Sequence, residues 1–557
     1  MRLLSAITAL LIALAAGAAV TPDYIIIGGE TSNSAASRID DIREVFRRAE
    51  QRGYNTVLIP VSWELIEPRE GQYNFSSLDN ILSTAQRSDI NVGLLWFGAW
   101  KNSMSCYAPA WVKTDTRRFP RARVEGGKPL EIVSPFSAEL LKADSAAFAA
   151  LVGKIASHPA RQKVALIQIE NEIGMLESAR DHSELANAIY AKGVPGELTS
   201  WLASHAETLH PTLIARWKAN GSKAFGSWEE VFGKGAESDE IFMAYNYARY
   251  VESLARIGRE RLPDMPFYLN AALNSRGRRP GQYPSAGPLA HLKDIYHCGA
   301  PTIDFLAPDI YDPGFSAWAG QYALPDNPLF IPEIKASADN PVQTLYALGA
   351  HDALGVCQFA FDRQPESSDS AAYDANTIMQ TLEPLLLRSR GKGLSNGIYL
   401  ESDTARAIIL RDSLCITARH ALSLPWAPKT PKGVTPASGG GLLLRVGPDE
   451  YILAGRGVVL TFEPLSALMS SAANVSAQLG EDGFAAQGSP AAAGGAGAAQ
   501  WRGQRIGLAS VDVVDIRPNG DIQSLRTLNG DETHQGRHVR IDADDFNIIR
   551  FKLYRYE

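Results

Sequence analysis

Short apolar runs alternate with segments of helical periodicity through the first two thirds of the chain. After the first run, Ile39, Ile42 and Val45 recur at helical spacing, and Ser37 is placed to cap that helix. Runs that are apolar on both faces, each followed by a helix, indicate a parallel sheet. The eight apolar runs lie at 24–30, 55–63, 90–98, 163–170, 266–273, 303–311, 329–334 and 355–361.

Eight such strand–helix units predict an α/β fold of the (β/α)8 TIM-barrel type over residues 20–390. An open, doubly wound sheet is the alternative, but no G-x-G-x-x-G motif follows the first run. The segment 177–240 is too long for a single crossover, so we expect a helical insertion there. Its tryptophans, Trp201, Trp217 and Trp228, are expected to form a local core.

The pattern changes after about residue 390. Stretches such as "GLLLRVGPDEYILAGRGVVLTFEP" alternate apolar and polar residues and are broken by Gly and Pro. Short strands at this spacing predict an antiparallel, β-sandwich-like domain over residues 391–557. Within it, residues 485–500 are rich in Gly and Ala and are expected to form a surface loop.

The first residues resemble a secretory signal. Arg2 precedes an apolar stretch that ends in Ala16-Gly17-Ala18, a small-residue cleavage site, which predicts a signal peptide over residues 1–19. A membrane anchor would need about 20 continuous apolar residues and is the weaker interpretation. The mature protein is therefore expected to be exported, to the periplasm or the medium, with no membrane segment.

Composition narrows the function classes further. The net charge of −7, with a pI near 5.9, offers no basic surface for nucleic acid. The four cysteines form no C-x-x-C pair and the ten histidines form no H-E-x-x-H motif, so we expect neither a metal nor a cofactor. A disulfide in an exported protein and the oligomeric state stay open. The cysteines are Cys106, Cys298, Cys357 and Cys415.

Chemistry is concentrated in "VALIQIENEIGML", where carboxylates flank an asparagine at the end of the fourth run. Strand alternation points Gln168, Glu170 and Glu172 into the barrel, and Asn171 joins them only if the strand kinks. Catalytic groups of this fold stand at the carboxyl ends of the strands, which favours Glu172 as a catalytic residue.

A second carboxylate, Glu333, closes the seventh run in "LFIPEI". The ends of strands four and seven lie across the same barrel mouth. Two carboxylates about 5–5.5 Å apart suit a retaining glycosidase, in which one protonates the leaving oxygen and the other attacks the anomeric carbon.

At these positions the chain resembles the glycoside hydrolases of clan A, and family 35, the β-galactosidases, in particular. "QIENEIG" resembles the Q-[IV]-E-N-E-Y-G signature of that family, which implies Glu172 as acid/base and Asn171 as a ligand of the sugar 2-hydroxyl. "LFIPEI" looks like the nucleophile strand and implies Glu333. "YAPAWV" and "VSWELIEPREGQYNF" match two further stretches, the second through Trp63, Glu67, Pro68, Gly71, Tyr73 and Phe75.

The sequence departs from that family at two sugar contacts: Pro60 stands where the family has a galactose-contacting tyrosine, and Trp100-Lys101-Asn102 stands in place of Cys-Ala-Glu. Ile173 also replaces the tyrosine that follows the strand-four glutamate in the family. The pattern is similar to a bacterial subgroup that includes xyloglucan-processing enzymes, which implies a β-galactoside of plant origin as the substrate. The alternatives are another glycone, such as β-glucose, β-xylose or α-L-arabinopyranose, and a non-catalytic carbohydrate-binding protein.

Further residues follow from their places at strand ends. Tyr311 ends the sixth run and is a candidate hydrogen-bond donor to the nucleophile. The negative neighbour is expected to keep Glu172 protonated until the nucleophile has reacted. The expected sugar contacts are Lys101 and Asn102 to hydroxyls, Trp100 by stacking, and Phe359 and Phe361 as an apolar platform.

Overall fold

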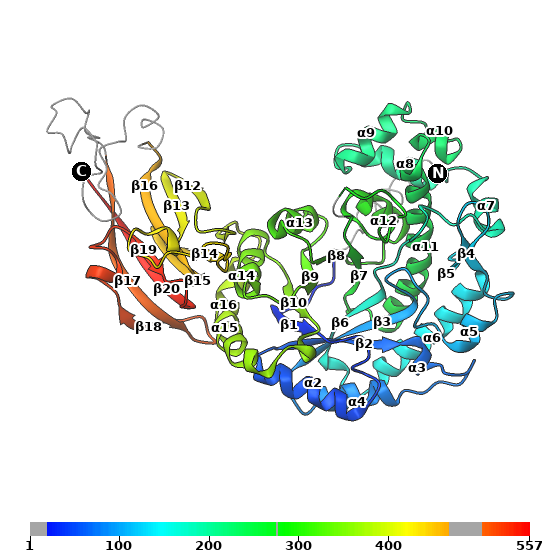
Figure 1. Ribbon diagram of the computed structural model, residues 1–557, viewed down its shortest axis with the longest axis horizontal. Helices are drawn as coiled ribbons and strands as arrows, with labels where there is room; N and C mark the ends of the chain where they lie inside the picture. Colours follow the sequence, from blue (N-terminus) through cyan, green and yellow to red (C-terminus); the bar gives the residue numbers. More distant parts are fainter. Residues whose placement is uncertain (1–18, 275–276, 467–503) are drawn as a thin grey trace, which may run out of the picture.

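The computed structural model of the protein describes residues 19–274, 277–466 and 504–557. Eight parallel strands close into a barrel in the order β1-β10-β9-β8-β7-β6-β3-β2 (Figure 1). Each predicted apolar run overlaps one of them, although β3 and β6 extend past the ends of their runs, so the predicted (β/α)8 barrel is confirmed. The strands are β1 (Ile26–Glu30), β2 (Thr56–Ser62), β3 (Asn91–Lys101), β6 (Val164–Asn171), β7 (Phe267–Ala272), β8 (Phe305–Ile310), β9 (Phe330–Ile334) and β10 (Gly355–Phe359).

The barrel encloses a small aromatic core. Tyr268 and Phe305 stack with their ring centroids 5.4 Å apart, and Phe330 packs edge-on against Tyr268. A larger apolar cluster surrounds the strands and joins them to the outer helices. The outer helices are α2 (Ile39–Gln51), α4 (Ser76–Ala85), α6 (Ala138–Ser157), α11 (Ala236–Arg261), α12 (Lys293–Gly299), α13 (Phe315–Tyr322), α14 (Asn340–His351), α15 (Asp369–Thr381) and α16 (Glu383–Ser389).

Smaller elements decorate the connections. Helices occupy most of the segment 177–240, and in it Trp217 and Trp228 are buried while Trp201 is half-buried. The small elements are α3 (Trp63–Ile66), α5 (Ala110–Thr114), the pair β4 (Arg121–Arg123) and β5 (Pro129–Val133), α7 (Glu184–Tyr190), α8 (Gly196–Ser204), α9 (Pro211–Ala219) and α10 (Trp228–Phe232). In the described residues no helix is both long and apolar enough to cross a bilayer.

Two antiparallel sheets follow the barrel, as predicted. A six-stranded sheet contains β11 (Ser395–Leu400), β14 (Gly439–Gly447), β15 (Glu450–Arg456), β20 (Asn547–Tyr556), β17 (Arg505–Ile516) and β18 (Ile522–Thr527). A four-stranded sheet contains β12 (Arg406–Arg411), β13 (Leu414–His420), β16 (Val458–Pro464) and β19 (Val539–Ile541). Residues 1–18 of the expected signal peptide and the expected 485–500 loop lie outside the described residues.

The β-domain packs on the barrel through α14, which directly follows β9 (Figure 1). Two glycines allow the close approach: a Cβ on Gly349 of α14 would lie 2.5 Å from the carbonyl oxygen of Asn396, and one on Gly397 would lie 2.4 Å from that of Tyr346. One face of the six-stranded sheet therefore joins the barrel's own apolar cluster, and the other face packs against the four-stranded sheet.

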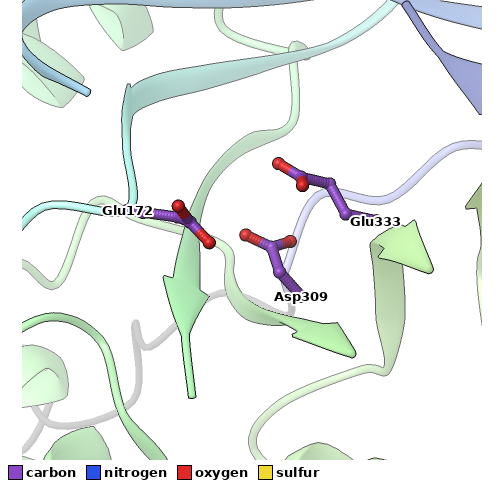
Figure 2. Close-up of side chains that lie close together, drawn as sticks. All are labelled: Glu172, Asp309 and Glu333. Atoms are coloured by element: carbon purple, nitrogen blue, oxygen red, sulfur yellow. The ribbon is translucent and has the colours of Figure 1, made fainter. Parts of the chain in front are cut away.

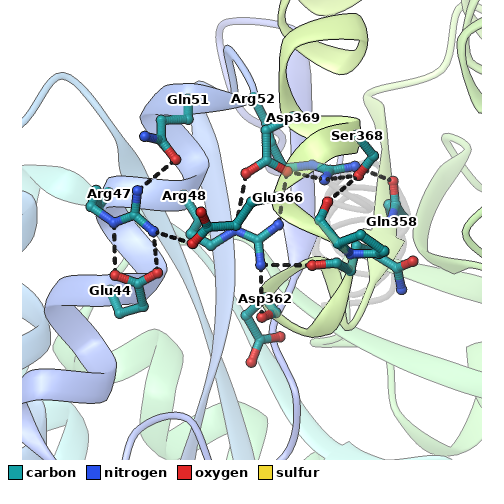
Figure 3. A network of polar contacts seen from close by, with 12 residues as sticks. Glu44, Arg47, Arg48, Gln51, Arg52, Gln358, Asp362, Glu366, Ser368 and Asp369 are labelled. Carbon is teal, nitrogen blue, oxygen red and sulfur yellow. Dashed lines mark hydrogen bonds and ion pairs between the residues drawn. The ribbon is translucent and has the colours of Figure 1, made fainter.

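A buried ion-pair network ties the segment after β10 to α2 (Figure 3). Asp369 accepts hydrogen bonds from Arg48 at 2.8 Å and 3.1 Å and from Arg52 at 2.6 Å. Arg52 also donates to the Gln358 side chain on β10. The four cysteines are free, and only Cys106 is exposed.

Candidate active site

Three carboxylates meet at the carboxyl-terminal mouth of the barrel. Glu172 directly follows β6, Asp309 lies near the end of β8, and Glu333 lies near the end of β9 (Figure 2). One oxygen of each lies within 4.8 Å of the other two, and all three side chains are buried. The predicted pair, Glu172 and Glu333, is thus brought together, with a third carboxylate beside it.

Backbone geometry at the end of β6 places Glu172. Glu170 and Glu172 both have positive φ, 59° and 45°. Side chains therefore stop alternating between the two faces of the sheet before β6 ends. Glu170 therefore does not point into the barrel, and that prediction was wrong. Its carboxylate accepts from the backbone N–H groups of Ala99 and Trp100, at 3.1 Å and 2.8 Å, and interacts with Asp144 of α6.

The same kink makes Asn171 available to the site. Lys101, at the end of β3, donates from Nζ to Asn171 Oδ1 at 2.8 Å. Asn171 Nδ2 is buried and has no hydrogen-bond partner among the described residues, so it remains free to donate. Burial acts to lower the pKa of Lys101, but the surrounding carboxylates, Glu333 and Glu172 foremost, raise it above its usual value. Lys101 is therefore a buried cation among carboxylates.

Glu172 is held from two sides. The Asn102 side chain donates to its Oε2, and its own backbone N–H donates to Asn270 Oδ1 at 2.9 Å. Burial and the Glu333 carboxylate raise the pKa of Glu172 to about 7, against the opposing effects of Lys101 and of a hydrogen bond with Asp309. This carboxyl can therefore hold a proton near neutral pH.

Glu333 receives a hydrogen bond on the other side of the site. The Tyr311 hydroxyl donates to its Oε2, the contact that the sequence suggested. Burial and the adjacent Glu333 raise the pKa of Tyr311, so Tyr311 remains a protonated donor. Tyr311 is 41% exposed, and the Phe359 ring packs against it edge-on at 6.2 Å. This part of the site faces solvent and presents aromatic surface.

Two residues that were expected to contact the sugar are buried, so those two predictions were wrong. Trp100 is fully buried, packs against Tyr247 and Tyr250, and donates from Nε1 to the Val133 carbonyl, so it cannot stack on a ligand. Phe361 is also fully buried. Its ring packs at 5.3 Å on Tyr54, and it lies against Gly29 of β1.

Three polar residues of the site were missed. Asp309 and Glu30 stand at or near the ends of their apolar strands, as Glu172 and Glu333 do, and that placement was the available signal. Asn270 of β7 links two neighbours, because its Nδ2 donates to Asp309 at 2.8 Å while its Oδ1 accepts from the Glu172 backbone.

The three carboxylates are also the only group found in the described ranges that could hold a metal ion. Buried Lys101 lies among the same carboxylates and already offsets part of their charge. The arrangement suits acid–base and nucleophilic chemistry, since one carboxyl is poised to give a proton beside another that accepts hydrogen bonds.

Parts of the chain match known protein families. Residues 35–246 match the family described as "Beta-galactosidase", glycoside hydrolase family 42, and residues 374–540 match a family described as a domain of unknown function. A beta-galactosidase from Arthrobacter sp. is 24% identical over 256 residues, which are 43% of this chain and 33% of that protein. The chain thus spans about a third of the length of that curated relative.

Two solved structures resemble the chain at lower sequence identity. The cold-adapted β-galactosidase from Rahnella sp. R3 is 16% identical with a TM-score of 0.45, over 69% of this chain and 59% of that one. A family 42 β-galactosidase from G. stearothermophilus is 17% identical with a TM-score of 0.45, over 65% and 57%.

The family match over residues 35–246 overturns the resemblance to family 35. That resemblance rested on short motifs, among them the strand ends that carry Glu172 and Glu333, whereas the family match spans residues 35–246. The departures at Pro60, Lys101 and Ile173 already separated the sequence from the family 35 pattern. The match over residues 35–246 points to glycoside hydrolase family 42, not family 35.

Proposed function

We propose that the protein is a retaining β-galactosidase that releases terminal β-D-galactose, with Glu333 as nucleophile and Glu172 as acid/base. The observation that carries the proposal is the approach of the two carboxylates to within 4.8 Å across the barrel mouth. Retaining enzymes separate this pair by about 5–5.5 Å, whereas inverting enzymes need about 6.5–9.5 Å to admit a water molecule.

In the first step, the ionised Glu333 attacks the anomeric carbon while Glu172 gives its proton to the leaving glycosidic oxygen. The pKa of about 7 leaves Glu172 largely protonated at mildly acidic pH. The Tyr311 hydroxyl, which donates to Glu333, favours the ionised form of that carboxylate.

In the second step, a water molecule attacks the glycosyl ester on Glu333. Ester formation removes the negative charge that raised the pKa of Glu172, so Glu172 can now take a proton from that water. Two inversions at the same carbon retain its configuration.

The free amide hydrogens of Asn171 are proposed to bind a sugar hydroxyl, since Lys101 already fixes the other end of that amide. Asn102 contacts Glu172 and is proposed to orient it. The galactose specificity is supported by the family match and by the names of the relatives. A plant oligosaccharide such as a xyloglucan fragment is the proposed natural source, to be tested beside simple galactosides.

The test is hydrolysis of nitrophenyl β-galactoside, β-glucoside, β-xyloside and α-L-arabinopyranoside, and of galactosylated xyloglucan oligosaccharides. We expect a preference for β-galactoside, with the β-anomer released first, as followed by proton NMR. Glu333→Ala and Glu172→Ala should both lose activity. Azide should rescue them with opposite product configurations, β-galactosyl azide for Glu172→Ala and α-galactosyl azide for Glu333→Ala.

Glu177→Ala is the matched control, because Glu177 is an exposed carboxylate close in sequence whose partner is the surface residue Lys128. Its activity should equal that of the wild type. First release of the α-anomer would refute the retaining mechanism. A preference for another glycone would refute the galactose assignment while leaving the mechanism in place.

A further inference from the structure

Glu30, the last residue of β1, has an unusual environment for a carboxyl group. Its side chain is fully buried, and neither Oε1 nor Oε2 has a hydrogen-bond partner among the residues that the structure describes. An ionised carboxylate buried without donors is strongly disfavoured, whereas a protonated one is not.

The neighbours of Glu30 reinforce this argument. The charged groups that act on it are Glu333, Glu172 and Asp309, with Lys101 as the one cation among them. Lys101 directs its ammonium at Asn171. Four carboxylates around a single ammonium cannot all ionise in a buried site.

The remaining titratable groups near Glu30 are neutral. Burial raises the pKa of Tyr268, Tyr311 and Cys357, so each of them keeps its proton. None of them donates a hydrogen bond to Glu30 within the described chain. The proton that Glu30 needs must therefore be its own.

Glu333 presents the matching acceptor. Its Oε2 accepts from Tyr311, but its Oε1 is buried and likewise has no donor within the described ranges. Glu30 lies within hydrogen-bonding reach of this carboxylate. Two carboxyl groups form a hydrogen bond only when one of them carries a proton.

We propose that Glu30 is held protonated and donates its carboxyl hydrogen to Oε1 of Glu333, as a positioning residue for the nucleophile. With Tyr311 on Oε2, both oxygens of Glu333 are then held and its plane is fixed toward the sugar. Burial and the neighbouring Glu333 raise the pKa of Glu30 well above its usual range, in agreement with this role. The proposal rests on the proposed function, in which Glu333 is the nucleophile.

The experiment compares pH profiles of kcat/KM for the wild type, Glu30→Gln and Glu30→Leu. Glutamine keeps a donor of similar shape, whereas leucine fills the space without one. Glu252→Gln is the control, since Glu252 is a buried glutamate on α11 that accepts from Thr302, away from the site. Thermal unfolding verifies that each variant is folded.

A protonated donor stabilises the ionised nucleophile. Its loss in Glu30→Leu should therefore move the acid limb of the kcat/KM profile, which reports the ionisation of Glu333, to higher pH. We expect about one pH unit, the scale of one hydrogen bond to a charged group. The acid limb of Glu30→Gln should stay in place. If Glu30 is instead ionised, both variants remove a negative charge and the limb moves to lower pH. That result, or no shift in Glu30→Leu, overturns the proposal.

A second measurement needs no activity. A protonated carboxyl has an infrared carbonyl stretch distinct from that of a carboxylate. The difference spectrum of the wild type and Glu30→Gln at neutral pH should contain this band, and its absence overturns the proposal even if Glu30→Leu does not fold. If the wild type hydrolyses no glycoside while the band is present, the proposed function fails and the protonation of Glu30 stands.

Discussion

Replacing Asp369 by asparagine should destabilise the protein severely. Asp369 is 5% exposed and is the carboxylate partner of both Arg48 and Arg52, whose side chains are also buried (Figure 3). Asparagine keeps the shape but removes the charge, which leaves two guanidinium groups buried without an anion. Breaking a buried pair by removing one partner costs about 3–5 kcal/mol.

That loss is a large part of the total stability, since folded proteins are stable by about 5–15 kcal/mol. The assay is urea unfolding at constant pH, followed by far-UV circular dichroism, with Glu366→Gln as the control. Glu366 belongs to the same network but is exposed and pairs with the exposed Arg47, so its loss should change the unfolding free energy little. A change below about 1 kcal/mol for Asp369→Asn would refute the argument from uncompensated burial.

Four further predictions concern Glu172, Tyr311 and two phenylalanines. Because Glu172 must be protonated in the first step, kcat/KM should fall as pH rises through about 7. A carboxyl whose pKa is raised on folding destabilises the folded protein once the pH exceeds the pKa of the unfolded state. The unfolding free energy of Glu172→Gln, measured in urea, should therefore rise by about 3 kcal/mol relative to that of the wild type between pH 4.5 and 7. A wild-type stability independent of pH in this window would contradict it. Tyr311→Phe should raise the acid limb of the kcat/KM profile by about one unit through the lost hydrogen bond to Glu333, and an unchanged limb would exclude that role. Phe361 is buried, so Phe361→Ala should lower the unfolding free energy, measured in a urea titration, by about 3–5 kcal/mol. Phe359 is half-buried at the edge of the site, so Phe359→Ala should instead raise KM. The reverse pattern would show that the two phenylalanines were misplaced.

The sequence was most informative where one physical rule dominates. Strands covered on both faces must be apolar throughout, and for that reason all eight barrel strands could be located. Carboxylates at the ends of such strands have few uses other than chemistry, which marked Glu172 and Glu333. The same rule applied to Asp309 and Glu30 would have found the rest of the cluster.

The sequence was least informative where a local backbone departure decides the outcome. The positive φ of Glu170 turns that carboxylate outward, and no pattern of residue types records it. The burial of Trp100 depends on Tyr247 and Tyr250 of α11, which are far away in the chain. The predicted family was wrong for a different reason: it rested on short motifs, whereas the family match extends over residues 35–246.

The close contact at Gly349 and Gly397 limits how the barrel and the C-terminal domain of this protein could be separated. Helix α14 follows the strand that carries Glu333 after a five-residue connection, and it packs against β11 and β14 of the second domain. The C-terminal sheets thus support the helix that follows the Glu333 strand and are not an independent appendage. A chimera that exchanged this domain would have to preserve two small residues and a close backbone-to-backbone fit in order to keep Glu333, the proposed nucleophile, in place.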